Sequence, residues 1–296
     1  MTREREREYN EGRDGFPSVS PFSAADGLTP TQVARLRQTL AQRPRGLLLD
    51  IDGTISPIAP TPEAARLLPG MPVLLERAAD AFDVLAVVSG RGAANARRMV
   101  GVERLLYIGN HGMERWLPGE SAPEIVPAVL PYLPAIAQAL DEAERDLTPR
   151  LPGVRIERKG ISGSVHTRGC ADPQQALTTV LETLRPLTAR LGLRLTEGKL
   201  VAEIRPPLAV HKGTAVEGVV QSRGLRSAIY LGDDTTDIDA FRALRRLREA
   251  GTCAGLAVAV LQAEAPPALA AEADLALPSI RAVPAFLEWV LAAASV

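Results

Sequence analysis

The sequence has little cysteine, little lysine, almost no net charge and no long apolar run. Two cysteines in 296 residues are far too few for a disulfide scaffold, so we expect a reducing compartment. No stretch approaches the roughly 20 apolar residues of a membrane helix, and no apolar segment follows the charged first residues as in a signal peptide. A formal net charge of −1 argues against a general nucleic-acid binder. We therefore expect a soluble, cytoplasmic, globular protein that binds neither nucleic acid nor membrane.

Five short apolar runs are each followed by polar or glycine residues. The runs are continuous rather than alternating, which is typical of strands buried on both faces of a parallel sheet. Stretches with helical patterning separate them, and this alternation predicts an α/β fold with a doubly wound, Rossmann-like parallel sheet. The predicted strands lie at 46–50, 84–88, 105–108, 228–231 and 256–260, and the helices near 71–80, 92–100, 212–223 and 235–249.

The middle of the chain has a different pattern. A helix, two strands, a second helix and two more strands are expected there, and the strands alternate apolar and polar residues as in a sheet with one open face. This order predicts a small α+β domain inserted into the α/β one. The expected organisation is a mobile N-terminal extension (1–28), an α/β core (29–113 and 208–296) and an inserted α+β domain (114–207).

Two carboxylates, Asp50 and Asp52, stand at the end of the first buried strand and are followed by Gly53. One carboxylate is placed to attack phosphorus as a nucleophile, and the other to protonate the leaving oxygen and then assist water. Gly53 tolerates the positive φ that such a bend requires. The alternative is a strand end with helix-capping aspartates, which α/β proteins often have.

Two further segments carry groups suited to a phosphate. Ser89, Gly90 and Arg91 follow the second strand and offer a hydroxyl, a backbone amide and a cation. Lys212 opens a helix in the second half, and its compact ammonium suits a carboxylate and a transferring phosphoryl group. Taken alone, each segment is more often an ordinary turn or surface feature.

An acidic turn follows the fourth strand and includes Asp233, Asp234 and Asp237. Hard carboxylate oxygens facing Asp50 suit Mg²⁺, which binds few protein groups and keeps waters. The alternative is a solvated turn that caps the next helix.

In this order along the chain, the four elements resemble those of the haloacid dehalogenase superfamily of phosphohydrolases. The resemblance implies Asp50 as nucleophile, Asp52 as acid/base, and Ser89 and Lys212 on the phosphate. It also implies Mg²⁺ on Asp50, the Asp52 carbonyl and Asp233, with Asp234 or Asp237 behind these ligands or as further ligands. The insertion falls between Ser89 and Lys212, where this superfamily places its larger, substrate-recognising cap.

Three further segments resemble motifs of the trehalose-6-phosphate phosphatase family. They are 109–114 (Gly-Asn-His-Gly-Met-Glu), 157–168 and 203–206. Paired carboxylates accept hydrogen bonds from adjacent sugar hydroxyls, so the implied recognition of a sugar is chemically sensible. Departures are Ile238, where an acidic residue is expected, and His211 before Lys212. The resemblance implies sugar-binding roles for Glu157, Lys159 and Glu203, with Ser162, Arg168 and His111 nearby.

Without the resemblance, simpler interpretations stand for several of these residues. Glu157 and Lys159 alternate on one strand and would then both face water. His111 would cap a strand end after its Gly-Asn turn. His166 and His211 are expected to be structural, and three scattered histidines form no zinc pattern.

The resemblance implies a Mg²⁺-dependent phosphatase that converts trehalose 6-phosphate to trehalose and phosphate through a phospho-Asp50 intermediate. Alternatives are a phosphatase of sucrose phosphate or mannosylglycerate phosphate, a sugar phosphomutase, and a non-catalytic switch in which a partner reads phospho-Asp50. The expected ligand is a small sugar phosphate, and a trehalose-6-phosphate synthase of the same pathway is a candidate protein partner.

Lysine usage supports the same interpretation. Of the 34 basic residues only three are lysines (Lys159, Lys199 and Lys212), and all the others are arginines. Such a preference for arginine is typical of a GC-rich genome. Two of the three lie in the implied site, where arginine's planar fork does not replace a compact ammonium. Because the whole chain is nearly neutral, an anionic substrate must be attracted by local cations or a metal ion.

Overall fold

The described part of the chain forms two sheets, and the larger has eight strands in the order β12-β11-β10-β1-β2-β3-β4-β5. In the computed structural model, which describes residues 28–263 and 265–295, the strands from β12 to β3 are parallel to one another, whereas β4 pairs antiparallel with β3 and β5 pairs antiparallel with β4. The predicted α/β fold with a parallel sheet is confirmed. The strands are β1 (Arg45–Leu49), β2 (Val84–Val88), β3 (Leu106–Gly109), β4 (Glu114–Trp116), β5 (Glu124–Ile125), β10 (Ser227–Gly232), β11 (Ala254–Val260) and β12 (Leu275–Leu277).

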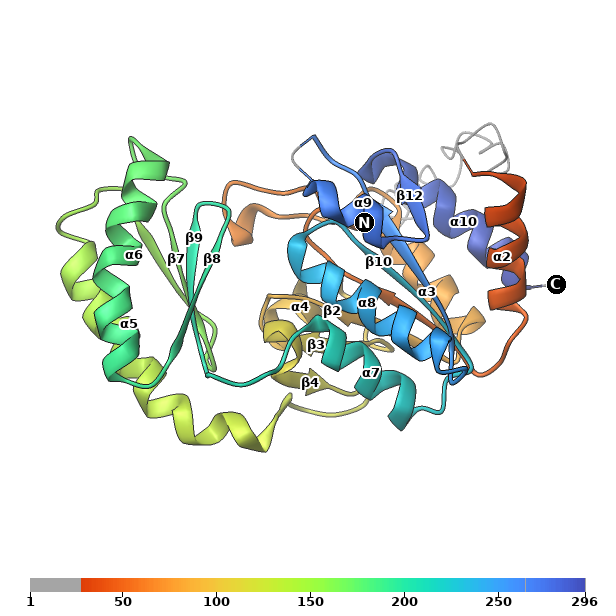
Figure 1. Ribbon diagram of the computed structural model, residues 1–296, viewed down its shortest axis with the longest axis horizontal. Helices are drawn as coiled ribbons and strands as arrows, with labels where there is room; N and C mark the ends of the chain where they lie inside the picture. Colours follow the sequence, from red (N-terminus) through yellow and green to blue (C-terminus); the bar gives the residue numbers. More distant parts are fainter. Residues whose placement is uncertain (1–27, 264, 296) are drawn as a thin grey trace, which may run out of the picture.

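Helices cover both faces of this sheet. Successive residues of a strand point to opposite faces, so Leu47 and Leu49 of β1 join one hydrophobic core and Leu48 joins the other. Among the described residues, four helices pack on the first core and three on the second (Figure 1). The first four are α2 (Pro30–Leu40), α3 (Met71–Ala81), α4 (Ala93–Val100) and α10 (Val283–Ala294); the others are α7 (Lys212–Ser222), α8 (Thr235–Glu249) and α9 (Pro267–Glu272).

Most of these elements lie where the apolar pattern predicts them. All five apolar runs are strands, and Thr29 caps α2 by accepting from the backbone N–H of Gln32. The sequence missed β12, because three residues are too few to show a pattern. The predicted extension lies outside the described residues except for Leu28, which is buried in the first core.

A second sheet of four antiparallel strands has the order β6-β7-β9-β8. Two helices cover one of its faces, and their apolar residues form a separate core with it. The order of helices and strands is the one that the sequence predicts for the middle of the chain. The elements are α5 (Leu133–Leu147), β6 (Arg155–Arg158), β7 (Gly163–His166), α6 (Pro173–Arg190), β8 (Arg194–Gly198) and β9 (Val201–Arg205).

The predicted start of the insertion, residue 114, differs from the structure. β4 pairs with β3, and β5 pairs with β4, so both strands extend the large sheet. A short antiparallel hairpin beside a parallel sheet has no alternation long enough to be assigned from sequence. The second unit therefore begins after β5.

Short 3₁₀ helices are η3 (Pro62–Ala64), η4 (Asn110–Gly112), η5 (Pro127–Tyr132) and η6 (Ile280–Ala282).

Arg45, the first residue of β1, joins the ends of three helices. Its buried guanidinium donates to the carbonyls of Leu40 (2.8 Å), Ala81 (2.9 and 3.1 Å) and Ala294 (2.6 Å), which are the last residues of α2, α3 and α10. Carbonyls at helix C-termini lack partners within the helix and favour a cation. One side chain therefore satisfies three helix ends at the edge of the sheet opposite Asp50.

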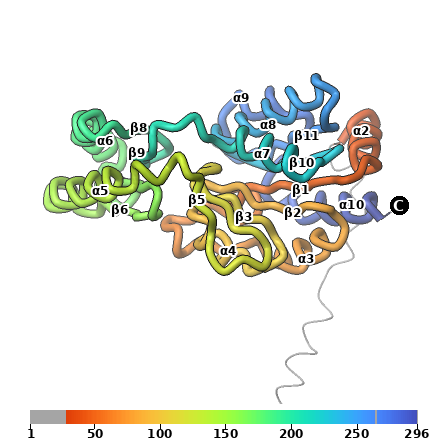
Figure 2. The backbone as a smooth tube through the Cα atoms, turned by 90° about the horizontal axis from the view of Figure 1, so that it is seen from below, coloured from red at the N-terminus to blue at the C-terminus, as the bar shows by residue number. Residues whose placement is uncertain are grey.

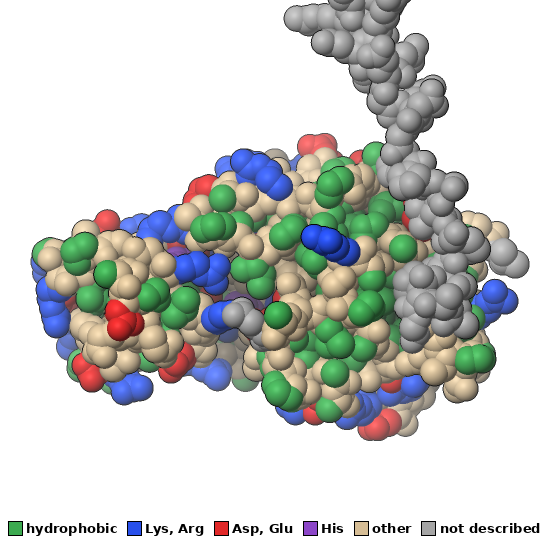
Figure 3. All heavy atoms as spheres, turned by 90° about the horizontal axis from the view of Figure 1, so that it is seen from above, with side chains coloured by type: hydrophobic (Ala, Val, Ile, Leu, Met, Phe, Trp, Pro, Cys, Tyr) green, Lys and Arg blue, Asp and Glu red, His purple; other side chains and the backbone are tan. Residues whose placement is uncertain are grey.

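The two units lie at opposite ends of the molecule's long axis in both views (Figures 1 and 2). The space-filling view shows a hollow between them, with basic side chains at its rim and histidine visible nearby (Figure 3). Within residues 28–263 and 265–295, none of the helices has the length and apolar character that a membrane crossing requires.

Candidate active site

The carboxyl ends of three neighbouring strands bring the predicted core residues together. Asp50 follows β1, Ser89 follows β2 and Asp233 follows β10, and β1 pairs in parallel with the other two. The backbone N–H of Asp50 donates to the carbonyl of Leu231 (2.9 Å), so the nucleophile candidate continues the ladder. The chain then turns sharply at Gly53, whose φ is 90°. Sheets of this type place their sites at this edge.

Asp50, Asp233 and Asp237 form a buried acidic cluster, with one oxygen of each within 4.8 Å of the others. Burial, with repulsion between the carboxylates, raises the pKa of Asp50 to about 8 and that of Asp233 to about 9. Such a concentration of negative charge favours a cation. Hard carboxylate oxygens are the ligands that Mg²⁺ prefers, so these residues fit the expected metal.

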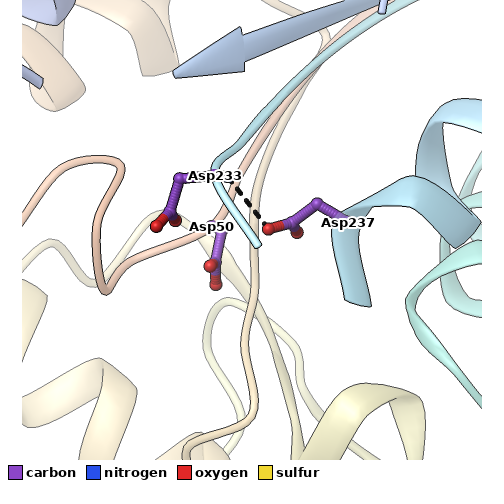
Figure 4. Close-up of side chains that lie close together, drawn as sticks. All are labelled: Asp50, Asp233 and Asp237. Carbon is purple, nitrogen blue, oxygen red and sulfur yellow. Dashed lines mark hydrogen bonds between the residues drawn. The ribbon is translucent and has the colours of Figure 1, made fainter. Parts of the chain in front are cut away.

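Asp237 differs from the other two because each of its oxygens accepts two hydrogen bonds. Its Oδ1 accepts from Lys212 Nζ (2.7 Å) and the Tyr230 hydroxyl (2.6 Å), and its Oδ2 accepts from the backbone N–H groups of Asp233 and Asp234 (both 3.0 Å). Figure 4 shows its carboxylate directed at this turn. Asp237 therefore serves as a buried anchor, while Asp50 and Asp233 retain oxygens for a metal.

Asp234 takes a different position from its neighbours. It is exposed and caps α8, its carboxylate accepting from the backbone N–H of Thr235 (2.6 Å). The alternative of a helix-capping aspartate thus describes this residue. Ile238, one of the departures, is buried in the second core on the same helix, where an acidic side chain would lack solvent.

Lys212 lies between two carboxylates. Its Nζ is 3.0 Å from Asp50 Oδ2 and 2.7 Å from Asp237 Oδ1, and the side chain is almost fully buried. Burial opposes its charge, but the two carboxylates outweigh burial and raise the pKa of Lys212. His211 caps the helix that presents Lys212, accepting from the backbone N–H of Gly213 (3.1 Å). This confirms the structural role expected of His211.

Asp52 and Arg91 form a two-pronged ion pair. Arg91 Nε lies 2.6 Å from Asp52 Oδ2 and Nη2 lies 2.7 Å from Oδ1, while Nη1 donates to the carbonyl of Pro62 (3.1 Å) and to Asn95 (2.9 Å). The sequence suggested Arg91 as a phosphate ligand; here its donors are turned to the acid/base candidate. Ser89, also predicted on the phosphate, is buried, and its Oγ accepts from the backbone N–H of Arg91 (3.2 Å).

The second unit contacts the core through its own charged residues. Lys159 Nζ lies 3.0 Å from Glu203 Oε1 and donates to the carbonyl of Gly90 (3.2 Å). His111 Nε2 is 3.4 Å from Glu203 Oε2. Burial would raise the pKa of Glu203, but Lys159 and His111 hold it well below its usual range. Lys159, Glu203, His111 and Gly90 are thus brought together at the joint between the units.

Of the remaining residues predicted in the cap, Glu157 has its partner within the second unit, whereas Ser162 and Arg168 have partners in the core unit. Glu157 Oε2 lies 2.8 Å from His166 Nε2, on the neighbouring strand. Ser162 Oγ donates to the amide oxygen of Asn110, and Arg168 Nη1 donates to the carbonyl of Ala59 (3.1 Å). Ser162 and Arg168 therefore contact the core unit directly.

A sequence model of the trehalose-phosphatase family matches residues 48–275. The chain belongs to this family. It is 36% identical over 211 residues to a trehalose-phosphate phosphatase of Mycolicibacterium paratuberculosis, covering 70% of this chain and 53% of the relative. It is also 36% identical over 221 residues to an uncharacterized glycosyl hydrolase of Mycobacterium tuberculosis, covering 72% of this chain and 16% of that protein. The chain thus spans about half the length of the first relative and a small part of the second.

A solved member of the trehalose-6-phosphate phosphatase group has the same fold. The C-terminal domain of the C. albicans enzyme superposes with a TM-score of 0.73 at 22% identity, covering 90% of this chain and 97% of that one. At this identity the likeness concerns the fold alone.

Several residues that support the site were not predicted for it. Asn110 belongs to the segment 109–114, which resembles a motif of the family. The φ angles of Asn110 (49°) and His111 (58°) place both residues in the left-handed region. Tyr230 is hidden in an apolar run, which marks it only as core. Thr54 and Gln262 both donate to Asp233. Gln262 follows a strand end by two residues, and that placement is a signal that could have found it.

Proposed function

We propose that this member of the trehalose-phosphatase family is a Mg²⁺-dependent phosphatase that hydrolyses trehalose 6-phosphate to trehalose and phosphate. The observation that carries the proposal is the meeting of two sets of residues. Lys212 Nζ lies 3.0 Å from Asp50 Oδ2 at the sheet edge. Lys159, which is paired with Glu203, donates to the carbonyl of Gly90 in the segment after the neighbouring strand. Phosphoryl chemistry and sugar recognition thus share one location.

In the proposed reaction, a carboxylate oxygen of Asp50 attacks phosphorus and the bond from phosphorus to the sugar oxygen breaks. Asp52 in its acid form gives a proton to that oxygen, releasing the sugar. Asp52 as a carboxylate then takes a proton from water, whose oxygen attacks the phospho-aspartate and releases phosphate. Arg91 orients Asp52, and Lys212, which is itself held by Asp237, orients Asp50.

Asp50, Asp233 and the carbonyl of Asp52 would hold the Mg²⁺. Bound there, the ion would offset repulsion between the carboxylates and the phosphate dianion. Asp237 would support this set by fixing Lys212 and the backbone of the turn, as its four hydrogen bonds indicate.

We further propose that the second unit acts as a cap in which Glu157, Lys159 and Glu203 bind sugar hydroxyls. Glu157 and Glu203 each have a partly exposed side chain (both 19%) and a partner that holds it in place. A site that satisfies hydroxyls strongly rejects analogues that lack them. Ser162 and Arg168 would instead fasten the cap to the core, since they contact Asn110 and Ala59.

A cytoplasmic location, and a trehalose-6-phosphate synthase as the source of substrate, complete the proposal. The synthase follows from the proposed reaction, because its substrate must be supplied by an enzyme that joins a sugar to a sugar phosphate.

The test is phosphate release from trehalose 6-phosphate, sucrose 6-phosphate, mannosylglycerate phosphate and glucose 6-phosphate, with Asp50→Asn as the blank. Trehalose 6-phosphate should have the highest kcat/KM, and activity that survives in the blank would overturn the mechanism. Glu157→Gln and Glu203→Gln should raise KM for trehalose 6-phosphate far more than for an aryl phosphate. Equal losses on both substrates would contradict the sugar assignment. Formation of a sugar bisphosphate would indicate a phosphomutase, and a long-lived phosphoprotein would indicate a switch.

A further inference from the structure

Gln262 lies at the end of a third strand and reaches the acidic cluster. It follows β11, which neighbours β10, while β1 lies beyond β10 in the same sheet. Its side-chain amide donates to the carbonyl of Gly53 (2.7 Å) and lies 3.4 Å from Asp233 Oδ2. One amide nitrogen therefore bridges the turn after Asp52 and the carboxylate after β10.

The surroundings of Asp233 show how closely this carboxylate is held. Thr54 Oγ1 donates to Asp233 Oδ1 (3.1 Å), so each oxygen faces one donor. A Cβ added at Gly53 would lie 1.8 Å from Asp233 Oδ2, so the carboxylate packs directly against the glycine backbone. The carboxylate is thus restrained by Thr54, Gly53 and Gln262.

The charge of these donors matters as much as their position. Thr54 and Gln262 are neutral, so they orient Asp233 without cancelling its charge. Lys212, the cation of the cluster, pairs with Asp50 and Asp237 instead. A neutral donor adds no positive charge beside Asp233, whereas a cationic side chain there would compete with the metal ion.

We propose that Gln262 is a positioning residue that sets the affinity of the site for its divalent cation by clamping Asp233 to the Gly53 turn. This inference rests on the proposed function in one respect, the presence of a metal between Asp50 and Asp233. Groups that orient metal ligands typically change metal affinity by 10-fold to 100-fold when they are removed.

The experiment is a titration of the 296-residue chain with Mn²⁺ alone, followed by the EPR signal of the free ion. Mn²⁺ is used because it shares the preference of Mg²⁺ for carboxylate oxygens. Gln262→Met keeps the side chain's length and removes the donor, and we expect it to raise the Kd about tenfold. Gln221→Met, on the exposed end of α7, is the matched control and should leave the Kd unchanged. A Kd for Gln262→Met within about twofold of the unsubstituted protein would overturn the proposal.

A second variant keeps the proposal testable if Gln262→Met folds poorly. Gln262→Lys places an ammonium beside Asp233, so it should raise the melting temperature of the metal-free protein while lowering Mn²⁺ affinity more than Gln262→Met does. Unchanged affinity in Gln262→Lys would also overturn the proposal, as would failure of the unsubstituted protein to bind Mn²⁺. The substrate panel is independent, because the titration contains no sugar phosphate. An inactive protein with the expected Mn²⁺ shifts would overturn the proposed function and leave the role of Gln262 standing.

Discussion

Arg91 holds both carboxylate oxygens of Asp52, at 2.6 and 2.7 Å, through two nitrogens of one guanidinium. Such paired contacts fix orientation as well as charge. The same guanidinium donates to the carbonyl of Pro62, and the next residue, Glu63, lies 2.7 Å from Arg155 of β6. Arg91 thus connects the orientation of Asp52 to the segment at 62–63, which contacts the second unit through Arg155.

Replacing Arg91 by Met should therefore impair proton transfer more than phosphate binding. A positioned acid or base contributes about 10²–10⁴-fold, so we expect a loss of about 100-fold in kcat with an alkyl phosphate, whose leaving group needs a proton. With p-nitrophenyl phosphate, whose leaving group needs little help, the loss should stay below about fivefold. Steady-state kinetics on both substrates check this. Equal losses would mean that Arg91 acts on the phosphate, as the sequence first suggested.

The acidic cluster should make stability depend on pH. Because the pKa values of Asp50 and Asp233 are raised to about 8 and about 9, the folded protein binds more protons than the unfolded chain between roughly pH 4 and 9. In EDTA, the melting temperature should fall by about 5 °C or more from pH 5 to pH 9. Excess Mg²⁺ should flatten this slope, because the cation replaces the protons. Asp233→Asn should flatten it without metal, and a melting temperature that rises with pH would contradict the prediction.

Gly90→Ala should disturb the joint between the units. A Cβ at this position would lie 2.8 Å from the His111 ring, which would have to move together with its contact to Glu203. Small displacements in a site cost up to about 100-fold, so we expect kcat/KM for the sugar phosphate to fall on the order of tenfold or more. Gly218→Ala is the control: it meets open space within α7 and should stabilise the protein by about 0.5–1 kcal/mol with unchanged kinetics. Similar kinetics in both variants would sink the idea.

Arg45→Met should destabilise the protein and leave the reaction untouched. Three helix-terminal carbonyls lose their donor, and buried carbonyls without partners cost about 1–3 kcal/mol each, although some will find water. We expect the free energy of unfolding to fall by about 3 kcal/mol, measured by urea denaturation, with kcat and KM within about twofold of the original. A large loss of kcat in protein that remains folded would show that β1 transmits the change to Asp50.

The sequence allows the fold and the positions of Asp50, Lys212 and Asp233 to be predicted, because buried parallel strands produce continuous apolar runs and their polar ends are easily recognised. Partners are harder to predict. Nothing local distinguishes Arg91 as a ligand of phosphate from Arg91 as a partner of Asp52, since the choice depends on distances between segments 39 residues apart.

The support of the site was missed for a related reason. Tyr230 lies in the apolar run 228–231, which marks it as a core residue, yet its hydroxyl reaches Asp237 across the turn. Gln262 is separated from Gly53 by 209 residues and meets it only because β11, β10 and β1 are neighbours in the sheet. Such contacts follow from the order of the strands, which the apolar pattern of each strand does not encode.

The hydrogen bonds from Arg45 to three helix ends affect which substitutions this protein can tolerate. Arg45 and Asp50 stand at opposite ends of one short strand, so the edge of the sheet that joins helix ends is distinct from the edge that concentrates charge. Substitutions at the first edge can strengthen packing without reshaping the second. Stabilising substitutions around Arg45 would therefore offset the stability lost through substitutions at the edge that carries Asp50, such as those that alter substrate choice.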